Sequence, residues 1–473
     1  MPAAVRTRIP FALIAGALLL ALAGAPRVGV SRTTLAVGLV ALAFVASAGY
    51  LIWTAKPCQV FTVAIMLAPF SGNWQAMGIP GTIAPDRLLV AGGILTVLLR
   101  GPAIRDRPPL RMRAVHWALV LAAAYAFSSA FFSHTLFHKV PGLRLVEAFG
   151  LIPFLAFTLA PVVFPTARER AVLLKGLVVL GGYLSLTTLL EMMGPKSLVF
   201  PRYILDPNYG IHVGRGRGPF ADAVANGFGL YVCAVACVIA TCLWKRRLWR
   251  ALAGVIAALC LVGTLLTLER SVWIGTVAGT IVVLAVVPST RRLVIPAVLV
   301  GALAVLVILS AFPSLSVKVS ARAQSQISVW DRENTDRVAL NMIYARPLFG
   351  FGWDRYLEFH LAYYQQSAEY PITDPIIDIP STPLTYGVEL GLVGLTLWIA
   401  ALLIAVGGAL FVRGPPDLVL WRNGLLAIFV FYAIIENFIP PTVFPNLIIW
   451  LWAGVLWSVR YPLRTASRVL ADD

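Results

Sequence analysis

The chain has 473 residues, of which 59% are hydrophobic and only 12% are charged, and its mean hydropathy is +0.84. Soluble domains carry about 25% charged residues, so the composition excludes an ordinary soluble protein and predicts a polytopic membrane protein. The net charge of +17 does not indicate nucleic-acid binding, because the cations are spread among short loops. The five cysteines lie in or beside apolar runs, where we interpret them as small buried apolar residues.

Apolar stretches near the ~20-residue length of a membrane-spanning helix recur from end to end. Residues 1–28 resemble a signal peptide, but Pro26 suits cleavage poorly, so we expect an uncleaved first helix. The sequence predicts an all-α polytopic integral membrane protein with about 12–14 transmembrane helices in a single domain over residues 1–473. The predicted spans are residues 9–25, 33–53, 58–72, 84–99, 114–133, 145–164, 171–192, 223–243, 248–267, 271–288, 293–312, 384–412, 418–437 and 443–459.

Short connections rich in arginine and lysine set the expected orientation. Such connections face the cytoplasm, which predicts that both termini are cytoplasmic. Two longer segments, residues 193–222 and 313–383, then face outward, and long loops in compact proteins are usually functional. Within the second we expect short helices, including one from Thr335 to Ala345, with Thr335 as its N-cap and Pro347 ending it. The cationic connections are residues 100–113, 166–170, 245–250, 289–292, 412–417 and 460–468.

Charge within the predicted membrane region gathers near the outer ends of the helices. Ion-coupled transporters usually place charged sites near the membrane midplane, so this distribution favours binding or chemistry at the outer face. The outward segments also contain more arginine than lysine, which suits bidentate capture of phosphate. The carboxylates near the outer helix ends are Glu147, Glu191, Glu269, Glu389 and Glu436.

Four motifs in order resemble the O-antigen ligase and O-antigen polymerase-like family of bacterial envelope glycan enzymes. The resemblance spans residues 200–400. It implies a multi-pass helical protein that transfers a glycan from an undecaprenyl-diphosphate-linked donor to an acceptor hydroxyl, with no metal or other cofactor. The motifs are RGRGPFADAVANG (215–227), TLERSVWIG (267–275), RVALNMIYARPLFGFGWDRY (337–356) and STPLTYGVELGLVG (381–394).

The resemblance also implies roles for individual residues. Arg215 and Arg270 match the arginines of the first two motifs and would bind the diphosphate, as we also expect of Arg217 and Arg337. Fixed guanidinium groups of this kind stabilise charge that develops on a leaving phosphate by several kcal/mol. We expect positioning roles for Gly218, Phe220, Asn226, Gly350 and Gly352, because glycines permit close backbone approach and Asn226 is placed to cap or hold the first-motif loop.

The fourth motif departs from the family pattern. It normally carries a histidine, proposed to activate the acceptor, whereas this chain has Pro380, Ser381 or Thr382 there, depending on the alignment. We expect the catalytic groups among His360, Ser381 and Glu389, and histidine suits proton transfer near neutral pH. Other outer-loop substitutes for the base are Glu358, Asp374, Asp378 and His212.

The expected partners are an undecaprenyl-diphosphate-linked glycan, a glycan or lipid acceptor and membrane lipids, and no nucleic acid. The expected location is the bacterial cytoplasmic membrane, with the active site facing outward. Two other classes remain open. A transporter or flippase for a lipid-linked oligosaccharide or small anion would need no acceptor, and a scaffold would bind the lipid diphosphate without turnover.

Overall fold

The computed structural model describes residues 54–79, 84–100, 112–364 and 378–460, and within these ranges it contains helices and no strands. Each predicted span inside the described ranges coincides with a helix, so the all-α polytopic prediction is confirmed. The predicted spans at residues 9–25 and 33–53 lie outside the described residues.

Nine helical segments of the described chain are long and apolar enough to cross a membrane. Three more apolar helices are shorter, namely α4 (Pro57–Leu67), α5 (Pro85–Arg100) and α12 (Arg270–Val286). The long segments are α6 (Ala114–Phe132), the continuous α7–η6–α8 (Lys139–Val163), α9 (Ala167–Met192), α10 (Ala223–Leu243), α11 (Arg247–Leu266), η10–α13 (Arg291–Ala311), α17 (Thr382–Leu410), α18 (Pro416–Ile435) and α19–η12 (Val443–Arg460).

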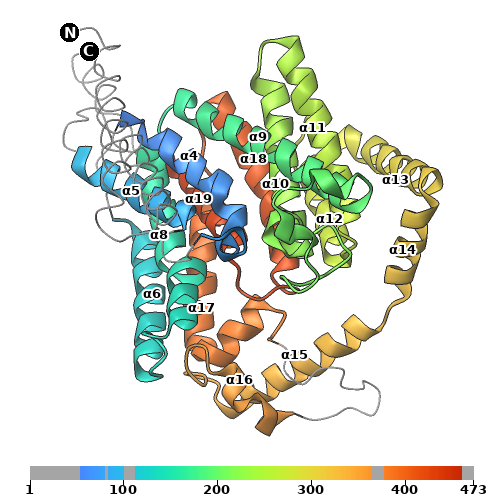
Figure 1. Cartoon of the computed structure of the whole chain (residues 1–473). Helices are drawn as coiled ribbons and strands as arrows, with labels where there is room; N and C mark the ends of the chain where they lie inside the picture. The colour runs from blue at the N-terminus through green and yellow to red at the C-terminus, as the bar shows by residue number, and fades with distance from the viewer. Residues whose placement is uncertain (1–53, 80–83, 101–111, 365–377, 461–473) are drawn as a thin grey trace, which may run out of the picture.

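Helices α10 and α19 form the centre of the bundle (Figure 1). In the most apolar 18-residue stretch of each helix, 89% of the residues of α10 and 83% of those of α19 are buried, so neighbouring helices cover both on most sides. Small residues allow this packing: a Cβ on Gly227 of α10 would lie 2.5 Å from a methyl of Val272 in α12. Close approach at small residues is the usual basis of helix association in membranes.

Two ends of the bundle carry different polar contacts. At one end, Arg170 of α9 donates to Asp417 of α18 at 2.7 and 2.9 Å, and to the Pro165 carbonyl. At the other end, the Thr382 N–H donates to the Glu436 carbonyl at 2.8 Å and joins the start of α17 to the end of α18. This second end holds the first residues of α10, α12, α17 and α19, and we call it the site end.

The segment between α13 and α17 extends around the side of the bundle, and we call it the external segment because it lies outside the bundle. Figure 1 shows α13, α14 (Pro313–Gln324) and α15 (Ile327–Ala345) following an arc, and the short α16 (Tyr356–Phe359) leads back toward α17. The predicted end of α15 at Ala345 is confirmed, but the predicted N-cap is wrong. Thr335 lies within the helix, where its hydroxyl donates to the Asp331 carbonyl at 2.7 Å, a bond to the preceding turn that threonine readily makes.

Candidate functional site

The loop of the first motif is fastened to two helices by backbone and amide hydrogen bonds. Asn226, fully buried in α10, donates from Nδ2 to the Gly216 carbonyl and to Thr188 Oγ1, each at 2.9 Å. The Gly216 N–H donates to the Leu266 carbonyl at 3.0 Å. Gly218 has φ +50°, and a Cβ there would lie 2.5 Å from Asn226 Oδ1. The loop therefore needs its glycines and the buried amide, and Asp222 caps α10 instead.

Arg217 and Arg215 serve different purposes although they are two residues apart. Arg217 is 1% exposed, and its guanidinium donates to the backbone carbonyls of Ile204, Tyr209 and Asp206. Its Nε and both Nη atoms are engaged in holding residues 202–210. The candidate site therefore includes Arg215 and leaves out Arg217, which maintains the shape of the loop.

Arg215 is paired with a buried carboxylate of the second motif. Glu269 is 1% exposed, precedes the first turn of α12, and pairs with Arg215 through Oε1. Its second oxygen lies 3.5 Å from Arg322 of α14. Arg270, the first residue of α12, donates to the Ser325 carbonyl at 2.5 Å, just beyond α14. The arc of α13–α15 thus places Arg322 and the Ser325 carbonyl in contact with the second motif.

Four arginines, Arg215, Arg270, Arg322 and Arg332, form what we call the arginine cluster. Burial, together with the nearby charges of Arg322, Arg332 and Arg270, lowers the pKa of Arg215 to about 10, and Asp222 opposes this shift. Burial also lowers the pKa of Arg332, with Arg322 and Arg270 acting in the same direction. Arg215 and Arg332 therefore lie near other cations in a partly desolvated region, where an anion is strongly stabilised.

His212 lies against the same carboxylate as Arg215. Its Nε2 is 3.5 Å from Glu269 Oε1, and its Nδ1 is 3.4 Å from Asp222 Oδ1. Asp222 is itself fixed as the N-cap of α10, accepting from the Val224 N–H at 2.7 Å. The histidine therefore lies between two carboxylates at the edge of the arginine cluster, with 22% of its side chain exposed.

Two of the predicted site residues lie in other surroundings. His360 is buried, its Nδ1 is 3.0 Å from the Leu357 carbonyl, and its ring packs beside Tyr356. Arg337 is on an exposed face of α15, whereas Arg332 of the same helix belongs to the arginine cluster. The sequence offered only the abundance of arginine in residues 313–383 as a signal for Arg322 and Arg332.

The third and fourth motifs interlock through their backbones. The N–H groups of Phe351 and Gly352 donate to the carbonyls of Val388 and Glu389 at 2.8 and 2.9 Å. Gly391 interrupts α17 with φ 67° and ψ −175°, and the following Leu392 N–H donates to the Pro347 carbonyl at 2.7 Å. The interlock fixes the end of the external segment to a kinked membrane helix, and the positioning roles of Gly350 and Gly352 stay predictions.

Glu389 and Ser381 both act in packing and capping. Glu389 is 1% exposed and pairs with Arg144, which also contacts Asp354 at 2.7 Å. Ser381 is the N-cap of α17, and its Oγ accepts from the Leu384 N–H at 3.5 Å. Glu389 lies within the interlock and Ser381 begins α17, and neither side chain has a contact with the arginine cluster among the described residues.

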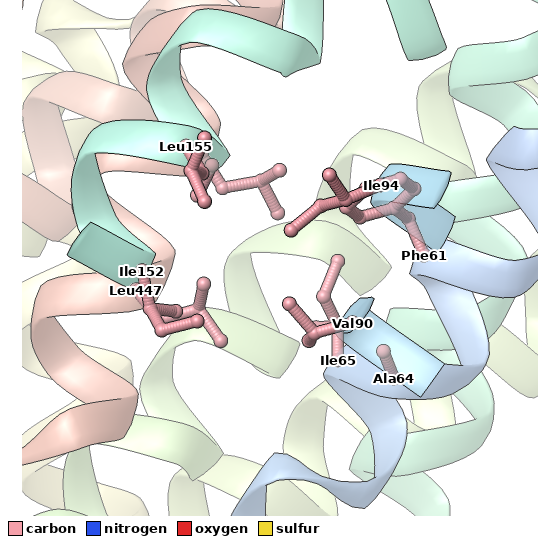
Figure 2. Close-up of a pocket in the computed structure, with 10 residues that line it drawn as sticks. Phe61, Ala64, Ile65, Val90, Ile94, Ile152, Leu155 and Leu447 are labelled. Atoms are coloured by element: carbon pink, nitrogen blue, oxygen red, sulfur yellow. The ribbon is translucent and has the colours of Figure 1, made fainter. Parts of the chain in front are cut away.

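Figure 2 shows a pocket in another part of the bundle, between α4, α5, α8 and α19. Its walls are apolar side chains such as Phe61, Val90, Leu155 and Leu447. A diphosphate needs cationic or hydrogen-bonding partners, and this pocket offers neither. The arginine cluster is therefore the better candidate for an anionic ligand.

Comparison with known families bears on the segment that carries most of the cluster. A family model described as O-antigen ligase matches residues 255–399. This segment is similar to the O-antigen ligase family. It runs from α11 into α17 and contains Glu269, Arg270, Arg322 and Arg332, whereas Arg215 and His212 lie before it.

The resemblance inferred from the four motifs is confirmed for the O-antigen ligase segment. The match supports, in general terms, a glycan-transferring envelope protein of ligase or polymerase type that uses a lipid-linked glycan and an acceptor. A search of the curated proteins found no match to the chain.

Proposed function

We propose that the protein is an envelope glycosyltransferase, a ligase or polymerase, that uses an undecaprenyl-diphosphate-linked glycan as donor. One observation carries the proposal: Arg215 and Arg322, from two distant segments of the chain, both contact the buried Glu269, and Arg270 and Arg332 lie near enough for their charges to lower the pKa of Arg215. Guanidinium groups match phosphate oxygens in charge and geometry. The cluster would bind the diphosphate and stabilise it as the leaving group.

We further propose that the site end faces outward from the bacterial cytoplasmic membrane and that the reaction needs no metal. Among the described residues, the cationic connections at 166–170, 245–250, 289–292 and 412–417 lie at the opposite helix ends, where arginine and lysine favour the cytoplasmic side. An outward site end would meet the donor where its head group is presented. The acceptor hydroxyl would approach from the same side and displace the lipid diphosphate.

Deletion of the gene, followed by mass analysis of surface glycan and lipid-linked intermediates, tests this function. Accumulated long lipid-linked chains indicate a missing ligase, and accumulated single units indicate a missing polymerase. A gene that encodes the Arg215→Ala variant should fail to restore the glycan product in the deletion strain, although the variant protein reaches the membrane in normal amount. Arg202→Ala should restore it, because Arg202 is exposed and donates only to the Lys196 carbonyl among the contacts of the described residues. Full activity of both Arg215→Ala and Arg270→Ala would refute the proposal.

Export of glycan that proceeds without any transfer to an acceptor would point to a transporter instead. Reconstituted vesicles separate these cases. A transporter would move the lipid-linked glycan across the bilayer with no acceptor present, whereas a transferase would form a new glycosidic bond only when the acceptor is added.

A further inference from the structure

The fourth motif lacks the histidine that would remove a proton from the acceptor, yet transfer to a hydroxyl needs a proton acceptor near the reacting carbon. Such a group must lie beside the diphosphate subsite and remain partly open to the acceptor. Ser381 caps α17 and His360 is buried next to Tyr356. We therefore expect the proton acceptor among the residues around the arginine cluster.

We propose that His212 is the catalytic base of the proposed transfer reaction, and that Asp222 positions its ring. The inference rests on the proposed function and names the residue that performs one of its steps. His212 contacts Glu269, and the same carboxylate pairs with Arg215. The base and the diphosphate-binding cations thus share one partner.

The ring of His212 faces a carboxylate through each of its two nitrogens. Nδ1 faces Asp222 Oδ1 at 3.4 Å, and Asp222 is held by its capping bond to the Val224 N–H. Nδ1 makes no hydrogen bond to the described residues, and a carboxylate beside it favours the tautomer that carries its proton on this nitrogen. The other nitrogen, Nε2, lies on the Glu269 side, where the two carboxylates compensate the positive charge of the protonated ring.

The backbone at His212 is also unusual. His212 has φ +60°, in the left-handed region that non-glycine residues seldom adopt. Such strained conformations tend to occur where a side chain must be presented in one particular direction. This conformation places the ring between the starts of α10 and α12, where it faces Asp222 and Glu269.

The acceptor hydroxyl gives its proton to Nε2 of His212, and its oxygen forms a bond to the anomeric carbon of the donor. The bond between that carbon and the diphosphate oxygen breaks, and the electron pair leaves with the lipid diphosphate, which the arginine cluster stabilises. The imidazolium then returns its proton to water. Charged groups facing the ring are Asp222, Glu269 and Arg215, with Arg322 and Arg332 from the external segment beyond them.

Membranes from the deletion strain, which hold the accumulated donor and the acceptor, provide the assay. Purified full-length protein is added and the transferred glycan is measured by mass spectrometry, while binding of undecaprenyl diphosphate is measured separately. We expect His212→Gln to lower the transfer rate by about 100-fold or more and to leave the affinity for undecaprenyl diphosphate within a few-fold. His134→Gln is the matched control, because His134 is exposed and has a similar φ of +59°.

Two further measurements separate catalysis from structure. Asp222→Asn retains a residue that caps helices well but removes the charge, so it should shift the pH profile of transfer and keep the thermal stability. Free imidazole should partly restore transfer by His212→Gly. Transfer at the normal rate by His212→Gln would refute the inference alone, as would loss of transfer with no imidazole rescue and no change in the Asp222→Asn profile. Failure of the unaltered protein to transfer glycan would refute the proposed function and this inference together.

Discussion

Replacement of Gly391 by alanine should uncouple the external segment from α17. Gly391 has φ 67° and ψ −175°, a backbone region that is essentially restricted to glycine and costs another residue on the order of 1–3 kcal/mol. An added Cβ would also lie 2.3 Å from the Leu348 carbonyl oxygen and 2.6 Å from the Gly350 nitrogen. These are backbone atoms, so relief requires the loop itself to move.

Such a movement breaks the interlock of the third and fourth motifs. The bonds at risk are those from the Leu392 N–H to the Pro347 carbonyl at 2.7 Å and from the Phe351 N–H to the Val388 carbonyl at 2.8 Å. At about 1 kcal/mol for each bond, with the backbone strain added, Gly391→Ala should weaken the docking by roughly 3–5 kcal/mol. Local opening of residues 347–352 would then become at least about 100-fold more frequent.

Limited proteolysis of the external segment, with thermal unfolding in detergent, measures this opening. Proteolytic rates follow the population of the locally opened form when reclosing is fast. Gly407→Ala is the matched control in the same helix, because no atom lies within 4 Å of its added Cβ and its φ is ordinary. Equal cleavage rates and equal unfolding midpoints for the two variants would show that the interlock does not hold the external segment.

Two other predictions concern charge. Burial raises the pKa of Asp336 in α15 to about 6, Glu333 adds to this and Arg332 opposes it. The folded protein therefore binds this proton more tightly than the unfolded chain does, so the contribution to stability is complete below about pH 4 and is lost as the pH rises through about 6. Asp336→Asn should reduce the pH dependence of the unfolding midpoint between these two pH values. An unchanged pH dependence would contradict the raised pKa of Asp336. Asp417→Asn should destabilise the protein by about 3 kcal/mol, because it leaves the buried Arg170 without its carboxylate. Glu358→Gln, which removes a more exposed pair with Arg355, should change stability by less than about 1 kcal/mol, and similar losses in both would contradict the burial argument.

Apolar runs near the spanning length predicted the helices well, because a membrane requires each crossing segment to satisfy its own backbone. The site was harder to predict. Arg215 and Arg217 differ by two positions in an irregular loop, so no periodicity could tell which side chain turns toward Glu269 and which toward the Ile204 carbonyl.

Long-range geometry set the rest of the site. Arg322 and Arg332 enter the cluster only because α14 and α15 follow an arc back to the bundle, a path that local patterns do not encode. The N-cap of α15 was misplaced for a related reason: Thr335 is a typical capping residue, but its hydroxyl bonds back to Asp331 inside a longer helix. The role of Asn226 in holding the loop could be predicted from the sequence, whereas the structure shows that Asp222 is the residue that caps α10.

The interlock at Gly391 has a consequence for how the protein is made. Arg215 and Glu269 leave the ribosome with α10 and α12, but Arg322 and Arg332 are held in place by a segment whose far end is fastened to α17. Membrane helices are inserted from the N-terminus onward, and early segments wait for later partners. The cluster therefore reaches its final form only after residues near 391 have entered the membrane, so a nascent chain would remain inactive toward the donor until its insertion is nearly complete.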